Sequence, residues 1–212
     1  MVKNIPEPEE DLPELSQLEL QGPGETTFIQ VAYRSPKADS DDFFAFSLME
    51  SLLTGPSNLN MFGSGGVGHH TSRLYLAMVD EGLAAGVGGS LSANIDPSTF
   101  TLYLTKNPTR TIEEVLQTLD SQIEALQSQP IAQTEIDRAL KQTKALFAYS
   151  SDNITNQAFW MGYASSFARY DWFTHYVDRI SSVTPEIIQS IAQKYLQPHA
   201  RVIGVYQPKD GN

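Results

Sequence analysis

Hydrophobic residues recur with two different periods along this chain, and each period predicts one kind of secondary structure. Phe100, Leu102 and Leu104 alternate with threonines and a tyrosine, which is typical of a strand with one buried face. Other runs are rich in β-branched and aromatic residues and are bounded by glycine or proline. We therefore predict strands at residues 27–33, 83–93, 99–105 and 201–206, of which the middle two form a hairpin.

Longer segments carry apolar residues three or four positions apart, which is typical of amphipathic helices. The segment Phe43–Leu53 is instead apolar on nearly every side, which predicts a helix enclosed in the core, capped by Asp39 or Ser40. Thr184 and Pro185 provide an N-cap and a first-turn proline for a late helix. We predict helices at about residues 43–53, 72–80, 112–126, 136–147, 154–169, 172–181 and 185–196.

The order of these elements indicates the fold class. Strand, helix, loop, short helix, hairpin, helical block and strand follow one another, which is neither strict βαβ alternation nor two segregated halves. We therefore predict an α/β protein of the α+β type, with a mainly antiparallel mixed sheet and helices packed on one face. We expect residues 1–16 to be an acidic, proline-rich, disordered linker, residues 17–208 to form a single domain, and residues 209–212 to be a tail.

Charge and composition narrow the classes of partner. The formal net charge is −11, from 25 acidic and 14 basic residues, and phosphate backbones require clustered Lys and Arg. Basic or neutral peptides suit such a chain better than nucleic acid. The chain has no cysteine, which excludes disulfides and thiolate metal sites. No signal peptide or membrane span is visible, so we expect a soluble protein, cytoplasmic or periplasmic, whose compartment the sequence does not identify.

Two sequence features suggest cofactors, and neither has the expected context. Gly63–Gly68 satisfies G-x-G-x-x-G, but a helix precedes the loop and no acidic residue follows at the spacing of a ribose ligand. His69 and His70 are adjacent and therefore diverge, whereas a metal site needs three or four converging ligands. His175 and His199 stand alone. We expect no metal and no cofactor in this chain, and nucleotide binding through Gly63–Gly68 is a remote alternative.

An aromatic-rich stretch could be mistaken for a ligand cage. Its helical spacing is more typical of packing between helices in a core. We therefore interpret it as core. The residues are Trp160, Tyr163, Phe167, Tyr170, Trp172 and Tyr176.

Arg73 is the residue whose position most suggests a function. It is a lone cation that follows the glycine-rich loop of residues 55–71 and leads through a short helix into a strand. Glycines at 65 and 66 allow a backbone to approach a ligand closely. The alternative is that Arg73 is solvated or pairs with a nearby acid such as Asp80 or Glu81, as most arginines near a helix start do.

An ordered set of short motifs resembles a known family. Thr71–Tyr75, Glu81–Ala84, Ile131–Glu135 and Val183–Glu186, with Asp96-Pro97 and Lys194–Leu196, resemble in order the second domain of insulinase-, pitrilysin- and mitochondrial processing peptidase-like zinc metallopeptidases. The resemblance spans roughly residues 27–207. It implies a processing-peptidase-like fold, and a whole subunit that contains two such domains.

The resemblance implies a division of labour between domains. In active subunits the first domain carries H-x-x-E-H and holds zinc, which polarises the peptide carbonyl and lowers the pKa of bound water. That motif is absent here, so the resemblance implies an inactive domain, excised from a longer protein, with zinc on a homologous partner domain or subunit. The long loop of residues 55–71 is similar to that of the inactive partner subunits.

The family also suggests which residues hold substrate. In its partner halves an arginine and a tyrosine hold the substrate backbone beside the opposite zinc, and Arg73 matches the arginine. The tyrosine falls near Ala85, so the contact is lost or another side chain such as Tyr75 replaces it. The implied substrate-binding residues are Arg73, Tyr75, Gly65 and Gly66, and no catalytic residue is expected.

These expectations combine into one hypothesis. The chain is a non-catalytic domain that forms chamber wall and a peptide-holding surface for a zinc-bearing partner in peptide hydrolysis. It is therefore not an enzyme alone but part of a zinc metalloendopeptidase system. The alternative is a purely structural scaffold or interaction domain that kept the fold without peptide handling.

Overall fold

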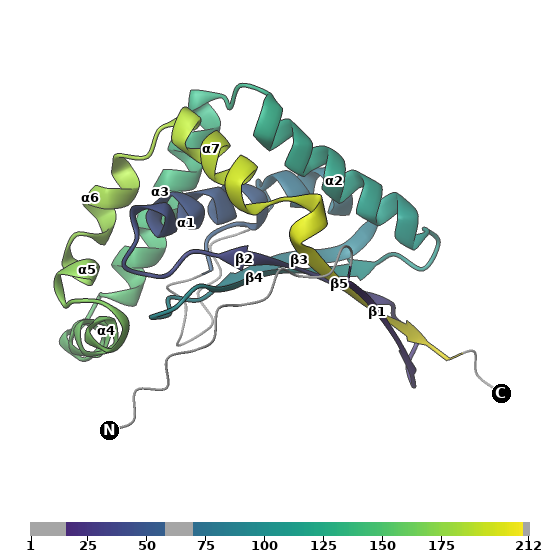
Figure 1. The fold of residues 1–212 in the computed structure, drawn as a ribbon, viewed down its shortest axis with the longest axis horizontal. Coiled ribbons are helices and arrows are strands. Elements are labelled where there is room, and N and C mark those ends of the chain that lie inside the picture. The colour runs from purple at the N-terminus through teal and green to yellow at the C-terminus, as the bar shows by residue number, and fades with distance from the viewer. Residues whose placement is uncertain (1–15, 58–69, 210–212) are drawn as a thin grey trace.

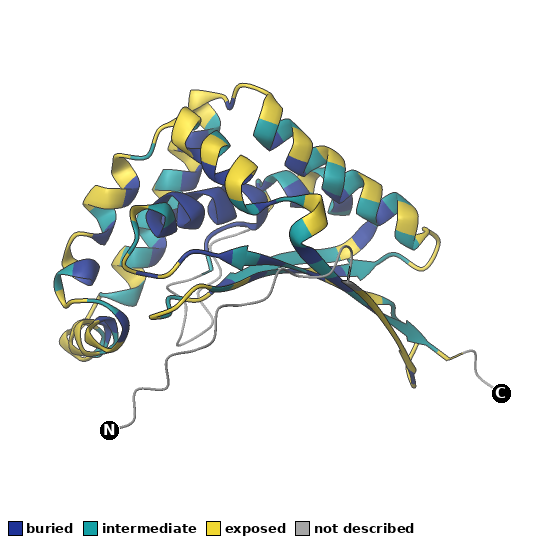
Figure 2. Cartoon of the chain, viewed as in Figure 1, coloured by how far each residue is buried: buried dark blue, intermediate teal, exposed yellow. Residues whose placement is uncertain are grey.

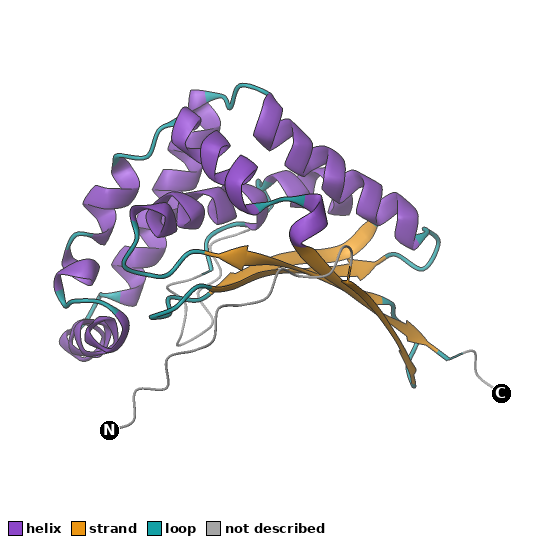
Figure 3. Ribbon diagram, in the orientation of Figure 1, coloured by secondary structure: helices purple, strands orange, loops and turns teal. Residues whose placement is uncertain are grey.

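The computed structural model describes residues 16–57 and 70–209, which fold as a sheet covered by helices (Figure 1). The helices lie together on one side of the sheet (Figure 3). The strands are β1 (Ser16–Gly22), β2 (Phe28–Ser35), β3 (Ala84–Leu91), β4 (Ser98–Lys106) and β5 (Arg201–Pro208). The helices are α1 (Asp41–Thr54), the π-helix η1 (Tyr75–Val79), α2 (Ile112–Ser128), α3 (Gln133–Ser150), α4 (Ile154–Phe167), α5 (Asp171–Thr174), α6 (Tyr176–Ser181), α7 (Pro185–Tyr195) and the 3-10 helix η2 (Pro198–Ala200).

The sheet is mainly antiparallel and mixed, as predicted. Its strand order is β1-β5-β2-β4-β3. Three neighbouring pairs are antiparallel, and only β1 and β5 run parallel. The predicted hairpin is β3–β4, with a bulge between Ala84 and Gly86. The fold class predicted from the sequence is therefore confirmed.

Helix α1 is the centre of the core. Every residue from Phe43 to Thr54 is buried, because α1 packs against β3, α3, α6 and α7 (Figure 2). A helix covered on all sides needs no polar face, which explains why apolar residues occur on nearly every side of α1. The predicted cap, Ser40, occupies the N-cap position, although its hydroxyl donates to the Lys37 carbonyl instead of capping a helix N–H.

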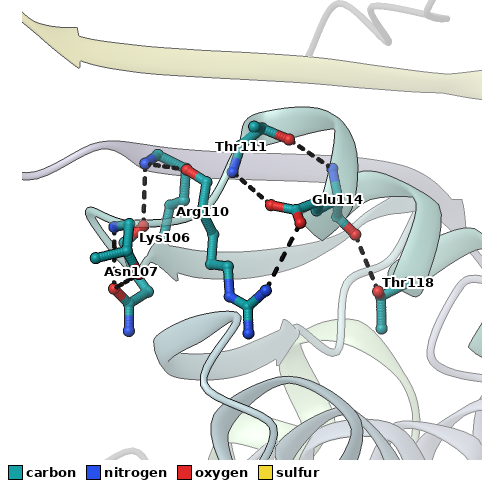
Figure 4. Close-up of polar contacts among 7 residues, drawn as sticks. Lys106, Asn107, Arg110, Thr111, Glu114 and Thr118 are labelled. Atoms are coloured by element: carbon teal, nitrogen blue, oxygen red, sulfur yellow. Dashed lines mark hydrogen bonds and ion pairs between the residues drawn. The ribbon is translucent and has the colours of Figure 1, made fainter.

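The turn from β4 into α2 is fixed by local polar contacts (Figure 4). Thr111 and Glu114 form a reciprocal capping box, in which each side chain accepts from the other residue's backbone N–H. The Lys106 ammonium donates to the carbonyl oxygens of Asn107 at 3.0 Å and Arg110 at 2.7 Å. These contacts set the direction in which α2 leaves the sheet.

Among the described residues, two of the buried polar side chains belong to charged residue types, Arg201 and Glu50. The Arg201 guanidinium is buried and donates to both carboxylate oxygens of Asp120 and to the Tyr33 hydroxyl, which joins β5 to α2 and β2. Burial raises the pKa of Tyr33. Glu50 of α1 is fully buried; its carboxyl accepts from the Ser57 hydroxyl and the Leu91 backbone, while Oε2 has no partner among the described residues. Burial raises the pKa of Glu50 to about 8.

The structure differs from the sequence prediction at three elements. The prediction contained no strand at β1, whose side chains from Gln17 to Gln21 are all exposed and therefore carry no burial pattern. The helix predicted over 172–181 is two short helices divided at His175, whose backbone angles, φ −100° and ψ 4°, are not helical. The short helix predicted over 72–80 is the π-helix η1.

The aromatic stretch is core, as interpreted, with one exception. Trp160, Phe167, Trp172 and Tyr176 are buried, and the Trp172 indole donates to the Ala38 carbonyl at 2.7 Å. Tyr170 is 62% exposed, because it lies in the turn before α5. The expected linker of residues 1–16 lies outside the described residues, apart from Ser16, which begins β1.

Candidate functional site

Arg73 lies just before η1 and is held by a carboxylate from another element. Its Nε is 2.5 Å from Oε1 of Glu135, and its Nη2 is 2.9 Å from Oε2. Both side chains are 16% exposed. The acid that pairs with Arg73 is therefore Glu135, at the start of α3, and not Asp80 or Glu81. The parallel, two-point contact fixes the plane of the guanidinium.

Arg73 also lines an open groove of about 630 Å³ between η1, α2 and α3. A guanidinium has five N–H donors, and the bonds to Glu135 use one on Nε and one on Nη2. Within residues 16–57 and 70–209, the two Nη1 donors have no hydrogen-bond partner. Other groove residues are Leu76, Glu81, Gln122, Thr134 and Arg138.

Tyr75 does not line this groove with Arg73. It begins the π-helix, and its ring contacts the edge of His70, with the centroids 4.5 Å apart. Single π-turns often occur at functional sites. Gly65, Gly66 and His69 lie outside the described residues, so of the four expected substrate-binding residues the structure places only Arg73 and Tyr75. These two are two positions apart within one helical turn, so their side chains leave the helix in different directions.

Ala85, where the resemblance implies a tyrosine, is the exposed residue of the β3 bulge. Ala84 pairs with Lys106 and Gly86 with Thr105, which leaves Ala85 without a partner on β4. The methyl group of Ala85 cannot donate a hydrogen bond. The substrate contact that the family's tyrosine provides is therefore not available from this position.

The described residues do not fit a zinc site. Within residues 16–57 and 70–209, no three His, Asp or Glu side chains converge as ligands, and zinc needs at least three protein ligands. His175 Nδ1 is already engaged by the Asp171 carbonyl. Nor does any helix in the described part of the chain have the length and apolarity to cross a bilayer.

The face of the sheet opposite the helices is a second candidate surface. Its side chains alternate with the buried ones along β2, β4 and most of β5. Four large side chains there are roughly half exposed: Leu18, Leu20, Phe28 and Tyr103, at 55, 54, 48 and 44%. We call this surface the open sheet face; its other residues are Gln30, Ala32, Arg34, Gly86, Gly88, Ser90, Thr99, Thr101, Thr105, Val202, Gly204 and Tyr206. This surface was not predicted from the sequence. Alternation of apolar and polar residues along a strand does not indicate whether other elements cover the polar face of the sheet.

A larger groove, of about 840 Å³, lies beside α5 and α6. Its arginines are paired: Arg169 lies 3.4 Å from Asp171 and Arg179 lies 3.7 Å from Asp41. Because both arginines form ion pairs with nearby aspartates, their charges do not indicate a particular ligand for this groove.

Comparisons with solved structures identify the fold. A protease from Helicobacter pylori is similar with a TM-score of 0.81 and 17% identity, over 98% of this chain and 48% of that one. The inactive peptidase domain of a proposed zinc protease from Bordetella parapertussis has a TM-score of 0.73 and 24% identity, over 91% and 96%. A proposed zinc protease from Bordetella pertussis Tohama I has a TM-score of 0.71 and 26% identity, over 87% and 96%.

These similarities agree with the family comparison. The chain spans about half the length of the Helicobacter pylori protease, and nearly all of the two Bordetella chains. No curated protein matches the sequence. The profile described as the peptidase M16 inactive domain matches residues 2–143, more than half of the chain. The chain therefore belongs to the peptidase M16 inactive domain family.

Proposed function

We propose that this domain forms chamber wall and a substrate-holding surface for a zinc-bearing homologous domain or subunit that hydrolyses peptides. Membership of the M16 inactive domain family carries the proposal. In this proposal hydrolysis belongs to the partner, and the described residues assemble no group of three zinc ligands. This chain can contribute the oriented guanidinium of Arg73 and the open sheet face.

Arg73 is the residue that we assign to substrate holding. The two bonds to Glu135 hold the Arg73 guanidinium in one plane. The Arg73 side chain also lines an open groove. A guanidinium held in one plane suits peptide carbonyl oxygens, because its donors have fixed directions and little rotational freedom is lost on binding. The chain therefore supplies binding and orientation, while the partner supplies the reacting groups.

The test is a pair of variants in the complex with the zinc-bearing partner. Arg73→Ala alone leaves the Glu135 carboxylate unpaired, so it tests holding and stability together. The double variant Arg73→Gln, Glu135→Gln removes both charges and keeps side chains that can bond to each other. We expect the double variant to raise KM at least fivefold with an unchanged melting temperature.

An exposed arginine provides the matched control. Arg110→Gln removes a cation that pairs only with Glu114 at 3.7 Å on the surface, and it should leave KM unchanged. If both Arg73 variants turn over substrate like the wild type, the domain holds no peptide at Arg73. The scaffold hypothesis then replaces the proposed one.

A further inference from the structure

A small pocket lies where helices α4 and α5 meet the end of strand β3, at one end of the helical layer (Figure 1). Its volume is about 50 Å³. A water molecule needs about 10–15 Å³ of such space, so the pocket has room for about three or four water-sized groups. All of the residues that line it are uncharged, and they include Phe43, Trp160, Tyr163 and Trp172.

The two tryptophans of this pocket differ in their hydrogen bonds. The Trp172 indole N–H donates to the Ala38 carbonyl oxygen at 2.7 Å. Trp160 is 2% exposed, yet its Nε1 has no hydrogen-bond partner among the residues that the structure describes. The rings of Phe159 and Tyr163 lie at 79 and 74° to the Trp160 ring, but a ring face is only a weak acceptor.

An unpaired buried N–H is unfavourable, and most such groups in folded proteins have a partner. The Trp160 Nε1 atom is enclosed, so the rings around it must shift when an acceptor reaches it. The adjoining pocket provides the space for this shift and for the ligand. Trp160 is therefore a donor placed beside a pocket, and a bound acceptor would satisfy it.

An open groove leads to the pocket from the surface. The groove has a volume of about 480 Å³ and lies between α4 and the turn that joins β3 to β4. Ala93 and Tyr163 line both the groove and the pocket. A group in the pocket can therefore belong to a longer molecule that lies in the groove.

The lining of the pocket determines which chemical group fits. An indole N–H donates and cannot accept, so it disfavours an ammonium group, although aromatic rings otherwise suit a cation. A carboxylate would lose its water without gaining a counter-ion, because the lining is uncharged. The hydroxyls of Ser92 and Tyr163, which also line the pocket, can accept hydrogen bonds. A carboxamide is uncharged and planar, and it has both an acceptor oxygen and N–H donors.

We propose that this pocket binds an uncharged carboxamide group, whose carbonyl oxygen accepts from the Trp160 indole N–H. The group belongs either to a free small amide or to an Asn or Gln side chain of a peptide in the groove. The pocket lies at the end of β3, whereas Arg73 and η1 precede the start of that strand. The inference therefore goes beyond the proposed function and does not depend on Arg73.

The experiment follows the indole N–H resonances of the ¹⁵N-labelled 212-residue chain by two-dimensional NMR. The chain has two tryptophans, and both line the pocket. The probes are acetamide, acetate and acetamidinium, which have the same shape but differ in charge. Acetamide should move the Trp160 resonance with a dissociation constant on the order of 1–10 mM, as expected of so small a ligand. Acetate and acetamidinium should bind at least tenfold more weakly, and the Trp172 resonance should move less than that of Trp160.

Three protein variants locate the site, with binding followed by tryptophan fluorescence. Trp160→Phe keeps a ring that can stack on Phe173 but removes the N–H, so acetamide should bind at least fivefold more weakly. Ala93→Leu places a larger side chain where the pocket and the groove meet, and it should abolish binding. Ala158→Leu, at an exposed position of the same helix as Trp160, is the control and should bind acetamide like the wild type.

Two short peptides distinguish the sources of the carboxamide. Gly-Gly-Gln-Gly-Gly is compared with its Glu counterpart and with propionamide, which reproduces the end of a Gln side chain. Binding of the Gln peptide at least tenfold more tightly than propionamide would show that the groove holds a polypeptide. Equal binding of the two would identify a free small amide as the ligand. Either result supports the carboxamide pocket.

Three results would overturn the inference. Equal movement of the Trp160 resonance by all three probes would show that the pocket does not recognise a carboxamide. A Trp160 resonance that stays in place at ten times the expected dissociation constant would mean that the pocket holds water only. Binding of acetamide to Ala93→Leu as to the wild type would place the ligand elsewhere.

Discussion

Glu50 offers the sharpest prediction, because it places an ionisable group in the centre of the core. Its pKa lies at about 8 in the folded chain against 4.5 for a free side chain, and burial is the main cause. Between these pH values the folded state holds a proton that the unfolded state has lost. The free energy of unfolding therefore falls as the pH rises from about 5 to about 8.

The magnitude follows from the same two pKa values. Each pKa unit corresponds to about 1.4 kcal/mol, so the interval from 4.5 to about 8 corresponds to about 5 kcal/mol of lost stability. Such a loss is a large fraction of the 5–15 kcal/mol typical of a domain. Glu50→Gln keeps the shape and the hydrogen-bond acceptor but cannot ionise, so it should escape this loss.

The assay is urea unfolding at pH values from 5 to 9. We expect wild type and Glu50→Gln to differ little at pH 5 and to diverge by up to 1.4 kcal/mol per pH unit, with the variant more stable at pH 8. Glu124→Gln, on the exposed side of α2, is the matched control and should follow the wild type. If the wild type and Glu50→Gln curves stay parallel across this range, Glu50 does not become charged inside the fold.

Three further substitutions test other parts of the structure. Asp120→Asn leaves the buried guanidinium of Arg201 without its charged partner. Since the Asp120 side chain is 45% exposed, we expect the free energy of unfolding in urea to fall by about 1–2 kcal/mol. An unchanged urea midpoint would show that the ion pair does not contribute to stability. Gly22→Ala places a methyl group where the Tyr206 ring lies, so the ring must move. We expect the variant to be less stable by about 1–3 kcal/mol, and the near-ultraviolet circular dichroism, which reports on aromatic side chains, to change. Gly162→Ala, at an open and exposed position within α4, should stabilise the chain by up to about 1 kcal/mol, and a lower melting temperature would contradict this expectation.

Local patterns in the sequence were sufficient for most of the fold. The segment Phe43–Leu53, apolar on nearly every side, predicted a helix enclosed in the core, and α1 is buried there. Thr184 caps α7 as predicted, because its hydroxyl accepts from the Ile187 N–H at 3.4 Å. Such signals depend on neighbours within one or two helical turns. They predict the elements and their type, and the order of the elements then restricts the arrangement of layers.

The features that the sequence did not predict depend on residues far apart. Strand β1 exists because β5, which follows it by about 180 residues, offers a parallel edge, and nothing near residue 16 indicates this pairing. Glu135 was part of the motif that carried the family resemblance, yet its contact with Arg73, 62 residues away, could not be inferred from either position. Neither could the exposure of Leu18, Leu20, Phe28 and Tyr103 on the open sheet face.

The strand order has a consequence for how the chain folds during synthesis. Strand β5, which follows the other four strands in the described sequence, occupies an interior position between β1 and β2, so this sheet cannot close until β5 has been synthesised. Until then β1 has no partner, and β2 has one unpaired edge. A nascent chain with unpaired strand edges is prone to aggregate, so closure of the sheet must wait for β5, and loss of this eight-residue strand would leave β1 without its partner as well.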